Sequence, residues 1–497
     1  MNKLLSIKFL CGLLFISCAG MLPAKARQLA AQPPANKTAA VPGSLNNAAM
    51  RQLALNGPSI QIDPSFAYYK NRSNESIVNE IELAGYRCVH YFVVNEKEVN
   101  GELIRAFQQR GIPVWMMALG NGTYSTKGLP EGWEQWKMKL LKRENGADGF
   151  TFFTPFNPHF VQWKKQVLVN LMNTYGFDGM ELAESYFPEW DAIKSGLYGD
   201  LSEWAAARFQ QQYGQALPEF LDTAAANYYK KIPAVYANWV QCRVDAVNDM
   251  LQEVYNGPGG IREKCPGRLV ATWTLGLDAG PQSVPLLREH QGMDAAAMIA
   301  KVKPDLHYIQ THWPDWGKSE QALPPDYMKT YTGFYNQIRE AGLQTPIALQ
   351  ADIGSSKNMI KSGKWVAAFS DACVQYKYAG WTAYEYHLGG YIYQDAPAPV
   401  KAARTDSKTI RISFSKRIDS ATAASPDAYQ FYKNGKALKA VVQQIQTDGN
   451  QVALTLKKKL PPNTQIGFSG IKDTPGLWLY KGYEAHTVAP EARVTVQ

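Results

Sequence analysis

The sequence predicts a (β/α)8 TIM barrel over residues 56–395, followed by a small all-β, Ig-like sandwich over residues 396–497. Two observations carry this prediction. First, eight short apolar segments alternate with helical segments up to His387, which is the order of a closed parallel barrel. Second, the pattern changes after Pro399 to period two, with turn residues between the runs, and this is typical of antiparallel strands.

The elements follow in order along the chain. Barrel strands are expected at 59–62, 87–94, 112–119, 177–183, 268–275, 305–311, 346–351 and 380–387. Helices are expected at 75–84, 102–110, 157–173, 235–255, 295–302, 327–341 and 364–378, with a helical insertion at 201–225. A doubly wound open sheet is the alternative, but it would normally carry a Gly-rich phosphate loop after an early strand, and the sequence has none.

The amino-terminal residues have the composition of a targeting segment. Residues 1–26 predict a signal peptide, because a basic start precedes an apolar run too short to span a bilayer and Ala24–Ala26 fits a cleavage site. Cys18 offers the alternative of a lipid anchor. Residues 27–55, rich in Ala, Gln, Pro and Asn, predict a flexible linker. We therefore expect an exported protein without a transmembrane segment, periplasmic, outer-membrane-attached or extracellular.

Composition narrows the class of ligand. Thirteen Trp and 27 Tyr in 497 residues favour either flat, weakly charged ligands such as sugars or an aromatic core. The formal charge is +9, of which residues 1–26 contribute three lysines, so the remainder carries a mild +6. No basic run is dense enough to predict nucleic acid. An anionic polysaccharide stays open as a ligand, although the charge does not indicate one. The four cysteines beyond the signal match no metal spacing, and we expect buried free thiols.

Function in such a barrel is expected at the carboxyl ends of the strands. The fourth strand runs into a loop rich in acids and aromatics, with Glu181 inside the strand and Glu184 at its end. Asp352 follows the seventh strand, and Glu385 lies in an otherwise uncharged eighth strand, where a charge is costly unless paired or functional. These four carboxylates are the catalytic candidates.

The other strand ends and loops supply amides, histidines and aromatics. The substrate-binding candidates are Asp63, His90, Asn121, Trp133, Trp136, Trp190, Trp273, Gln310, His312, Trp313, Trp316, Gln350, Tyr384 and His387. At least three of the loop tryptophans 133, 136, 190, 313 and 316 are expected to line one cleft as sugar platforms. The histidines are too scattered for a metal site, and no cofactor is expected.

Paired carboxylates with aromatic and amide side chains are the groups that glycoside hydrolysis needs. We expect Glu184 to act as general acid, with Glu385 or Asp352 as the opposing carboxylate and Glu181 as the substitute for Glu184. Tyr186, Phe187 and Glu181 beside Glu184 would raise the pKa of its carboxyl by desolvation and like charge.

Two segments carry a resemblance. YGFDGMELAE resembles the fourth strand of glycoside-hydrolase TIM barrels, and AGWTAYEYHLGG resembles the eighth strand of related bacterial glycosidases. The resemblance covers about residues 56–490 and implies a secreted enzyme that cleaves O-glycosyl bonds of a poly- or oligosaccharide. The sequence departs from it at Ala183, where one large clan has Asn before its catalytic Glu. The acids of chitinase-like barrels would fall on Glu181, Ala183 and Ser185, so that set is not intact.

Two other functions stay open. A non-catalytic carbohydrate-binding protein on the same scaffold would show tryptophans along a groove without facing carboxylates. A metal-dependent hydrolase would need a tight His/Asp cluster. The sandwich is expected to serve packing or attachment, because its sequence shows no cluster of polar residues at any one end.

Overall fold

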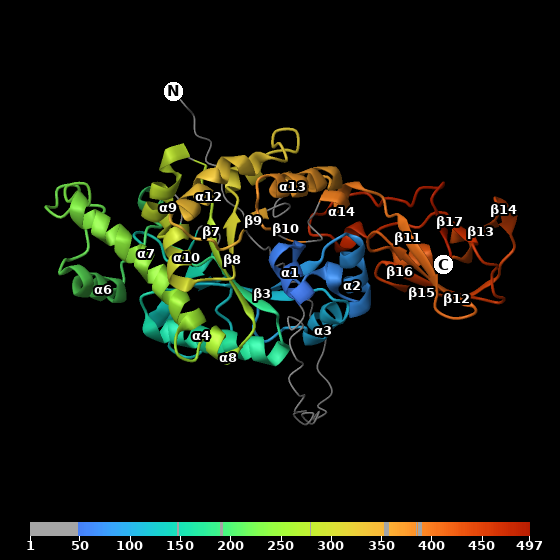
Figure 1. Ribbon diagram of the computed structural model, residues 1–497, viewed down its shortest axis with the longest axis horizontal. Coiled ribbons are helices and arrows are strands. Elements are labelled where there is room, and N and C mark those ends of the chain that lie inside the picture. Colours follow the sequence, from blue (N-terminus) through green and yellow to red (C-terminus); the bar gives the residue numbers. More distant parts are fainter. Residues whose placement is uncertain are drawn as a thin grey trace, which may run out of the picture.

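Eight parallel strands close into a barrel in the computed structural model of the chain, which confirms the predicted fold class (Figure 1). The structure describes residues 48–146, 149–188, 192–278, 280–351, 357–383, 385 and 390–497. The barrel strands are β1 (Pro58–Ile62), β2 (Cys88–Val93), β3 (Val114–Leu119), β6 (Gly179–Ala183), β7 (Leu269–Leu275), β8 (Leu306–Gln310), β9 (Ile347–Ala351) and β10 (Trp381–Ala383). Around the ring their order is β1-β10-β9-β8-β7-β6-β3-β2, so β6 and β10 stand four places apart and face each other across the barrel.

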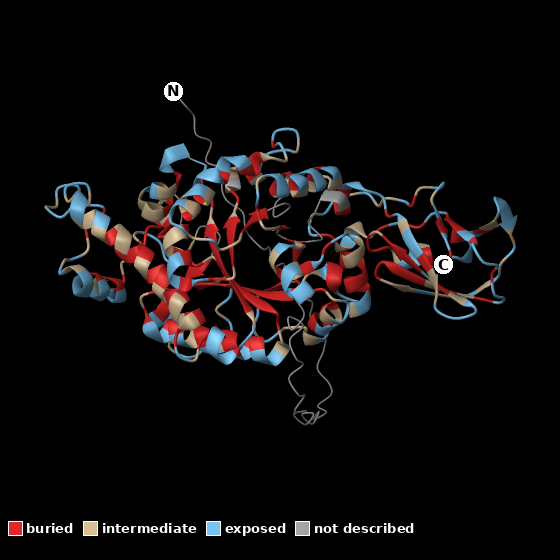
Figure 2. Ribbon diagram, in the orientation of Figure 1, coloured by how far each residue is buried: buried red, intermediate tan, exposed pale blue. Residues whose placement is uncertain are grey.

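Helices surround this ring, and the strands inside it are almost wholly buried (Figure 2). The longer helices are α2 (Asn74–Leu83), α3 (Gly101–Gln109), α4 (Pro158–Tyr175), α6 (Glu203–Tyr213), α7 (Pro233–Asn256), α9 (Ser283–Gln291), α10 (Ala295–Val302), α12 (Thr332–Glu340) and α13 (Gly363–Gln375). Short helices are α5 (Ala192–Ser195), α8 (Ile261–Lys264), α11 (Trp313–Trp316) and α14 (Gly390–Gln394). Short 3₁₀ turns are η2 (Ala67–Tyr69), η3 (Trp133–Trp136), η4 (Gly280–Gln282), η5 (Tyr327–Tyr331) and η6 (Lys357–Met359).

Local sequence explains why the helices begin and end where they do. Asn157 caps α4, because its side-chain oxygen accepts the backbone N–H of His159 at 2.9 Å, and Pro158 occupies the first turn. Gly176 ends the helix at φ 70°, a conformation that favours glycine. The helix therefore stops at Tyr175, three residues before Asp178, and the chain continues directly into β6.

Three segments differ from expectation. Residues 48–56, expected to end the linker, form helix α1 (Ala48–Asn56). Its Ala54 carbonyl accepts the indole N–H of Trp115 inside the barrel at 3.1 Å, which ties α1 to the amino-terminal end of the strands. In the insertion expected to be helical over 201–225, α6 ends at Tyr213, because Gly214 takes φ 66°. Helix α9 was not anticipated.

The carboxyl-terminal part forms two antiparallel four-stranded sheets with their own hydrophobic core. One sheet is ordered β11-β12-β16-β15 and the other β14-β13-β17-β18. The strands are β11 (Pro399–Arg404), β12 (Thr409–Phe414), β13 (Tyr429–Lys433), β14 (Lys436–Leu438), β15 (Val442–Asp448), β16 (Gln451–Leu456), β17 (Gln465–Phe468) and β18 (Arg493–Thr495). Small elements complete the chain: the hairpin β4 (Gly122–Thr123) and β5 (Thr151–Phe152), helix α15 (Ser420–Ala423), and turns η8 (Pro426–Ala428) and η9 (Pro475–Leu477).

The sandwich is packed against the barrel rather than tethered beside it. Trp478 is buried with the hydrophobic cluster of the barrel, against Tyr393 and Tyr483. A buried ion pair between Lys416 and Asp473, 2.6 Å apart, lies beneath it, with the Lys416 ammonium 5.1 Å from the Trp478 ring. The barrel and the sandwich therefore share a buried interface.

Two sequence expectations concern the whole chain. The cysteines at 88, 242, 265 and 373 are buried and free, as predicted. Among the described residues, no helix is both long enough and apolar enough to cross a bilayer.

Candidate active site

Glu181 belongs to a polar layer inside the barrel. Its Oε2 lies 2.6 Å from Nδ1 of His90 on β2, and both side chains are fully buried. The contact is close in distance but is not aligned as a hydrogen bond, and neither Glu181 oxygen has an aligned donor among the described residues. The other nitrogen of His90, Nε2, lies 3.0 Å from the hydroxyl of Tyr308 on β8.

Packed aromatic rings surround this polar layer inside the barrel. The His90 ring stacks on Trp115 at 5.8 Å, and Gly179 leaves the space that the Trp115 indole fills, since a Cβ there would lie 2.5 Å from it. Burial, followed by the charge of Glu181, raises the pKa of the Tyr308 hydroxyl, so this group stays protonated. His90 and Glu181 are thus brought together, and they lie within the packed interior rather than at the rim.

Glu184 occupies the carboxyl end of β6 in an unusual backbone conformation. Its φ is 54°, in the left-handed region, where a side chain with a Cβ costs roughly 1–2 kcal/mol. The next residue, Ser185, is fully buried against Gly120, where a Cβ would lie 2.1 Å from the Ser185 hydroxyl oxygen. The left-handed turn therefore sends Ser185 inward and leaves Glu184 half-buried at the rim.

Asn121 holds the chain that follows Glu184. Its Oδ1 accepts the backbone N–H of Tyr186 at 2.9 Å, and its Nδ2 donates to the carbonyls of Tyr186 and Phe153, both at 3.0 Å. Both polar atoms of the fully buried amide are used in this clamp. Asn121, expected to bind substrate, instead fixes the loop that carries Glu184.

A buried arginine supports the same loop from the other side. Arg243 on α7 lies with its guanidinium 4.4 Å from the ring centres of Phe187 and Tyr198, and it donates to the carbonyls of Glu289 and His290. Sequence reasoning missed this residue, because the partners lie more than 40 positions from it. Its position in the helix that precedes β7 gave no signal of the contact.

Glu385 lies at the carboxyl end of the facing strand and is almost fully buried. Its Oε2 accepts the backbone N–H of Asp63 at 2.5 Å, and its Oε1 accepts the hydroxyl of Tyr69. Burial, followed by the charge of Glu385, raises the pKa of Tyr69, so the hydroxyl stays protonated and donates. Two donors from the segment after β1 therefore fix this carboxylate, and Asp63 acts through its backbone.

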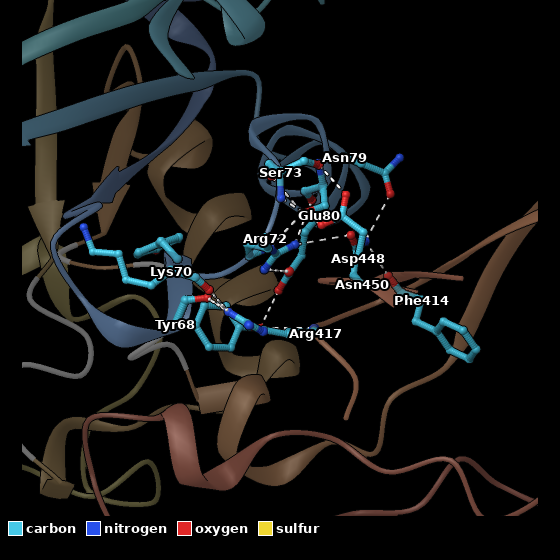
Figure 3. Close-up of polar contacts among 12 residues, drawn as sticks. Tyr68, Lys70, Arg72, Ser73, Asn79, Glu80, Phe414, Arg417, Asp448 and Asn450 are labelled. Carbon is cyan, nitrogen blue, oxygen red and sulfur yellow. Dashed lines mark hydrogen bonds and ion pairs between the residues drawn. The ribbon is translucent and has the colours of Figure 1, made fainter. Parts of the chain in front are cut away.

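The sandwich in turn holds the turn after β1 through contacts of Arg417 with Tyr68 and Lys70 (Figure 3). The Arg417 guanidinium donates to the carbonyls of Tyr68 and Lys70, the latter at 2.9 Å, on either side of Tyr69. The Arg417 backbone N–H donates to the Tyr68 hydroxyl at 3.2 Å, and that hydroxyl donates to Glu80 at 2.5 Å. The partner of Glu385 is thus positioned across the interface between barrel and sandwich.

A second set of contacts fixes α2 against the turn between β15 and β16. Arg72 pairs with Glu80 at 2.7 Å, with both side chains almost fully buried. The backbone N–H of Ser73 donates to Asp448 at 2.8 Å, and the Asn450 amide donates to Asn79 at 3.1 Å. Neither Tyr69 nor Arg417 was singled out from the sequence, although the aromatic pair at 68–69 directly follows the first strand.

The remaining candidates divide between rim and core. Trp273 is buried, and its indole N–H donates to Gln350 at 3.0 Å, while its ring lies 6.1 Å from Tyr186. Gln310 is half-buried at the end of β8. His312 is half-buried, and burial lowers the pKa of its imidazole to about 4.

Two of the five loop tryptophans can be placed. Trp136 is a core residue, packed against Phe160 and Trp163, so its ring does not offer an open face to a sugar. Trp133 is half-buried against Phe153. Asp352, Trp190, Tyr384 and His387, and the side chains of Trp313 and Trp316, lie outside the described residues.

Within the described ranges, no three His, Cys, Asp or Glu side chains gather as ligands of a metal would. The ends of the facing strands β6 and β10 instead carry one carboxylate each: Glu184, which is half-buried, and Glu385, which is almost fully buried and is held by Tyr69 and the Asp63 backbone. Two carboxyl groups on either side of a glycosidic bond can cleave it: one donates a proton to the leaving oxygen, and the other attacks the sugar or activates water.

Comparisons with known proteins find similar chains among solved structures. No protein-family model matches the chain, and no curated protein matches it. Among solved structures, the chain is similar to the PgaB (BpsB) glycoside hydrolase domain from Bordetella bronchiseptica, at 11% identity and a TM-score of 0.49, over 67% of this chain and 95% of that one. It is also similar to the catalytic domain of β-amylase from Paenibacillus polymyxa, at 10% identity and a TM-score of 0.45, over 67% of this chain and 92% of that one. A β-galactosidase from the psychrophilic Marinomonas ef1 is similar at 13% identity and a TM-score of 0.47, over 66% of this chain and 53% of that one.

Proposed function

We propose that the protein is a glycoside hydrolase that cleaves O-glycosyl bonds of a poly- or oligosaccharide with two carboxylates. The observation that carries the proposal is Glu184, held at φ 54° at the carboxyl end of β6. A left-handed glutamate is an unfavourable choice for structure alone, and such outliers gather at functional sites. Its place in the ring, four strands from β10, supports Glu385 as its partner.

The roles follow from the surroundings of each carboxylate. Glu184, half-buried at the rim, acts as general acid and gives its proton to the leaving glycosidic oxygen. Glu385 is fixed by Tyr69 and the Asp63 backbone, so its oxygens are oriented before substrate arrives, and it attacks the sugar or activates water. Asp352 stays the alternative to Glu385, and the half-buried Gln310 and His312 are proposed to bind sugar hydroxyls.

The test is release of reducing ends from a panel of polysaccharides by the full chain and by Glu184→Gln and Glu385→Gln. Loss of either group should lower kcat by a factor of about 10³ or more, equivalent to roughly 4 kcal/mol of barrier. Glu98→Gln is the matched control, because Glu98 is exposed on the loop after β2, on the same side of the barrel. Its activity should match that of the wild type.

Glu184 is not the acid if Glu184→Gln keeps more than about a tenth of the activity, a loss below ~1.4 kcal/mol. If the wild type binds a polysaccharide but cleaves no member of the panel, the protein is a non-catalytic carbohydrate-binding barrel. We also propose export, directed by residues 1–26, and the mass of the secreted chain tests whether it begins at Arg27 or at an acylated Cys18.

A further inference from the structure

Charge is divided unevenly between the two parts of the chain. Residues 399–497 hold 15 Lys and Arg against seven Asp and Glu, a net charge of +8. Residues 48–398 hold 32 Lys and Arg against 36 Asp and Glu, a net charge of −4. The mild charge of the whole chain therefore hides a basic sandwich on an acidic barrel.

The fold gathers much of this charge at one end of the sandwich. Strand β12 begins after Lys408, β16 runs into Lys457–Lys459, and the β13–β14 hairpin adds Lys436, with Lys439 just beyond it. Backbone hydrogen bonds join these loops, from Leu456 to the Lys408 carbonyl and from Lys457 to the Val441 carbonyl, both 2.9 Å. We call the exposed set the basic tip: Lys408, Lys436, Lys439, Lys457, Lys458 and Lys459.

The basic tip lies at the end of the sandwich that faces away from the barrel. Asp448 and Asn450, in the turn between β15 and β16, contact the barrel. Because β16 has six residues and a strand rises about 3.4 Å per residue, its far end stands roughly 20 Å from that turn. Figure 1 shows β14 at the extremity of the molecule.

The charges of the tip are not neutralised within the protein. None of its six ammonium groups makes an ion pair with any residue that the structure describes. The acid of the same loops, Asp406, accepts the backbone N–H groups of Lys408 and Thr409 and so shapes the turn. A dense set of like charges raises the local potential and attracts polyanions.

A hollow of about 320 Å³ opens beside the tip, along β13 and the chain from Ala437 to Ala440. Gln430, Tyr432 and Lys439 lie among its lining residues, so an amide, a phenol and a cation meet there. Its size is near the lower limit of small-molecule sites, and this chemistry suits an acidic sugar unit. Of the large apolar side chains that are exposed in the described chain, Val441 is the one near the tip. A membrane-binding surface would usually present several Trp, Phe or Leu side chains.

From these observations, we propose that the sandwich binds an anionic polysaccharide through the basic tip and the adjoining hollow. The cations attract the chain of carboxylates, and the hollow receives one sugar unit beside Lys439. This site lies apart from the barrel rim, so its binding does not depend on hydrolysis by Glu184 and Glu385.

Binding of the full chain is measured by affinity electrophoresis through gels that contain polygalacturonate, with neutral dextran for comparison. Wild type should be retarded by polygalacturonate and not by dextran, and the retardation should fade as NaCl rises from about 0.05 to about 0.5 M, because salt screens exposed charges. Replacing Lys457, Lys458 and Lys459 together by Gln should weaken binding by about tenfold or more. These side chains are exposed, so the melting temperature should stay within about 2 °C of the wild type.

The matched control replaces Lys230, Lys264 and Lys364, three exposed lysines of the barrel, by Gln and so removes the same net charge. It should keep wild-type retardation. The proposal is overturned if both triple variants lose binding equally, if dextran retards the protein as strongly, or if salt has no effect. It is also overturned if vesicles of phosphatidylcholine with phosphatidylglycerol bind the protein while polygalacturonate does not, because the tip would then be a membrane anchor.

Discussion

Arg417→Met is expected to destabilise the whole protein, because Arg417 joins the sandwich to the turn that positions Tyr69. The side chain is 9% exposed, and its guanidinium donates to the Tyr68 and Lys70 carbonyls. A hydrogen bond from a charged group contributes about 1.5 kcal/mol or more, so the loss of both gives about 3 kcal/mol. Methionine fills a similar volume, and the loss therefore reports the hydrogen bonds more than a cavity.

Urea unfolding measures this change. Twelve of the 13 tryptophans lie before residue 399, so Trp fluorescence reports mainly the barrel, while far-ultraviolet circular dichroism reports both parts. The two probes should give one shared transition in the wild type, and Arg417→Met should either lower its midpoint or separate the two probes. Arg411→Met is the control, because Arg411 is exposed on β12, the strand that precedes Arg417, and should change stability by no more than about 0.5 kcal/mol.

A further readout connects this contact with the proposed chemistry. Arg417→Met should lower kcat, because Tyr69 loses the support that aims it at Glu385, whereas Arg411→Met should not. The reasoning is refuted if Arg417→Met unfolds at the same midpoint as Arg411→Met with coincident probes. Equal stability would mean that water replaces the guanidinium at the two carbonyls without cost.

Two more predictions follow from single residues. Glu184→Asn should lower activity by about 10³-fold or more while the free energy of unfolding stays level or rises by up to about 1 kcal/mol, because asparagine tolerates φ near 54° better than glutamate. A loss of both stability and activity in the urea and reducing-end assays would instead make Glu184 structural. Burial lowers the pKa of His307 to about 3, so the unfolded chain binds a proton below about pH 6.5 that the folded chain does not, and stability should fall by about 2 kcal/mol from pH 7 to pH 5. His307→Gln should remove this part of the loss, and urea curves with an unchanged pH slope would contradict the assignment.

The barrel could be predicted because its strands carry a strong and local signal. Strands buried on both faces read as continuous apolar runs, as in VHYFVV and IPVWMMAL, and glycines punctuate the helices between them. Helix α1 was assigned to the linker because only Met50 and Ala54 are buried, too few to show a period. Residues 214–225 were expected to continue the helical insertion, although Gly214 ends the helix.

The candidate site was predictable only as far as strand order determines it. Strand ends meet at one rim, so the places of Glu184 and Glu385 on facing strands followed from counting strands. The contacts that orient these two side chains could not be predicted from strand order. Tyr69 meets Glu385 across 316 positions, and Arg417 meets Tyr68 across 349, and no local pattern reports a pair so far apart.

The same limit applies to the net charge of the chain. An average over 497 residues gives a mild charge, yet electrostatic attraction acts over a Debye length of about 8 Å at physiological salt. The loops that carry Lys408, Lys436 and Lys457 are separated by more than 20 positions in sequence. Pairing of β12 with β16 brings Lys408 beside Lys457, and the Lys433 ammonium of the β13–β14 hairpin donates to the Pro462 carbonyl in the loop after β16. Local density of charge, rather than its sum, decides what the surface attracts. A partner for this end of the molecule is therefore expected from the topology of the sandwich and not from the composition of the chain.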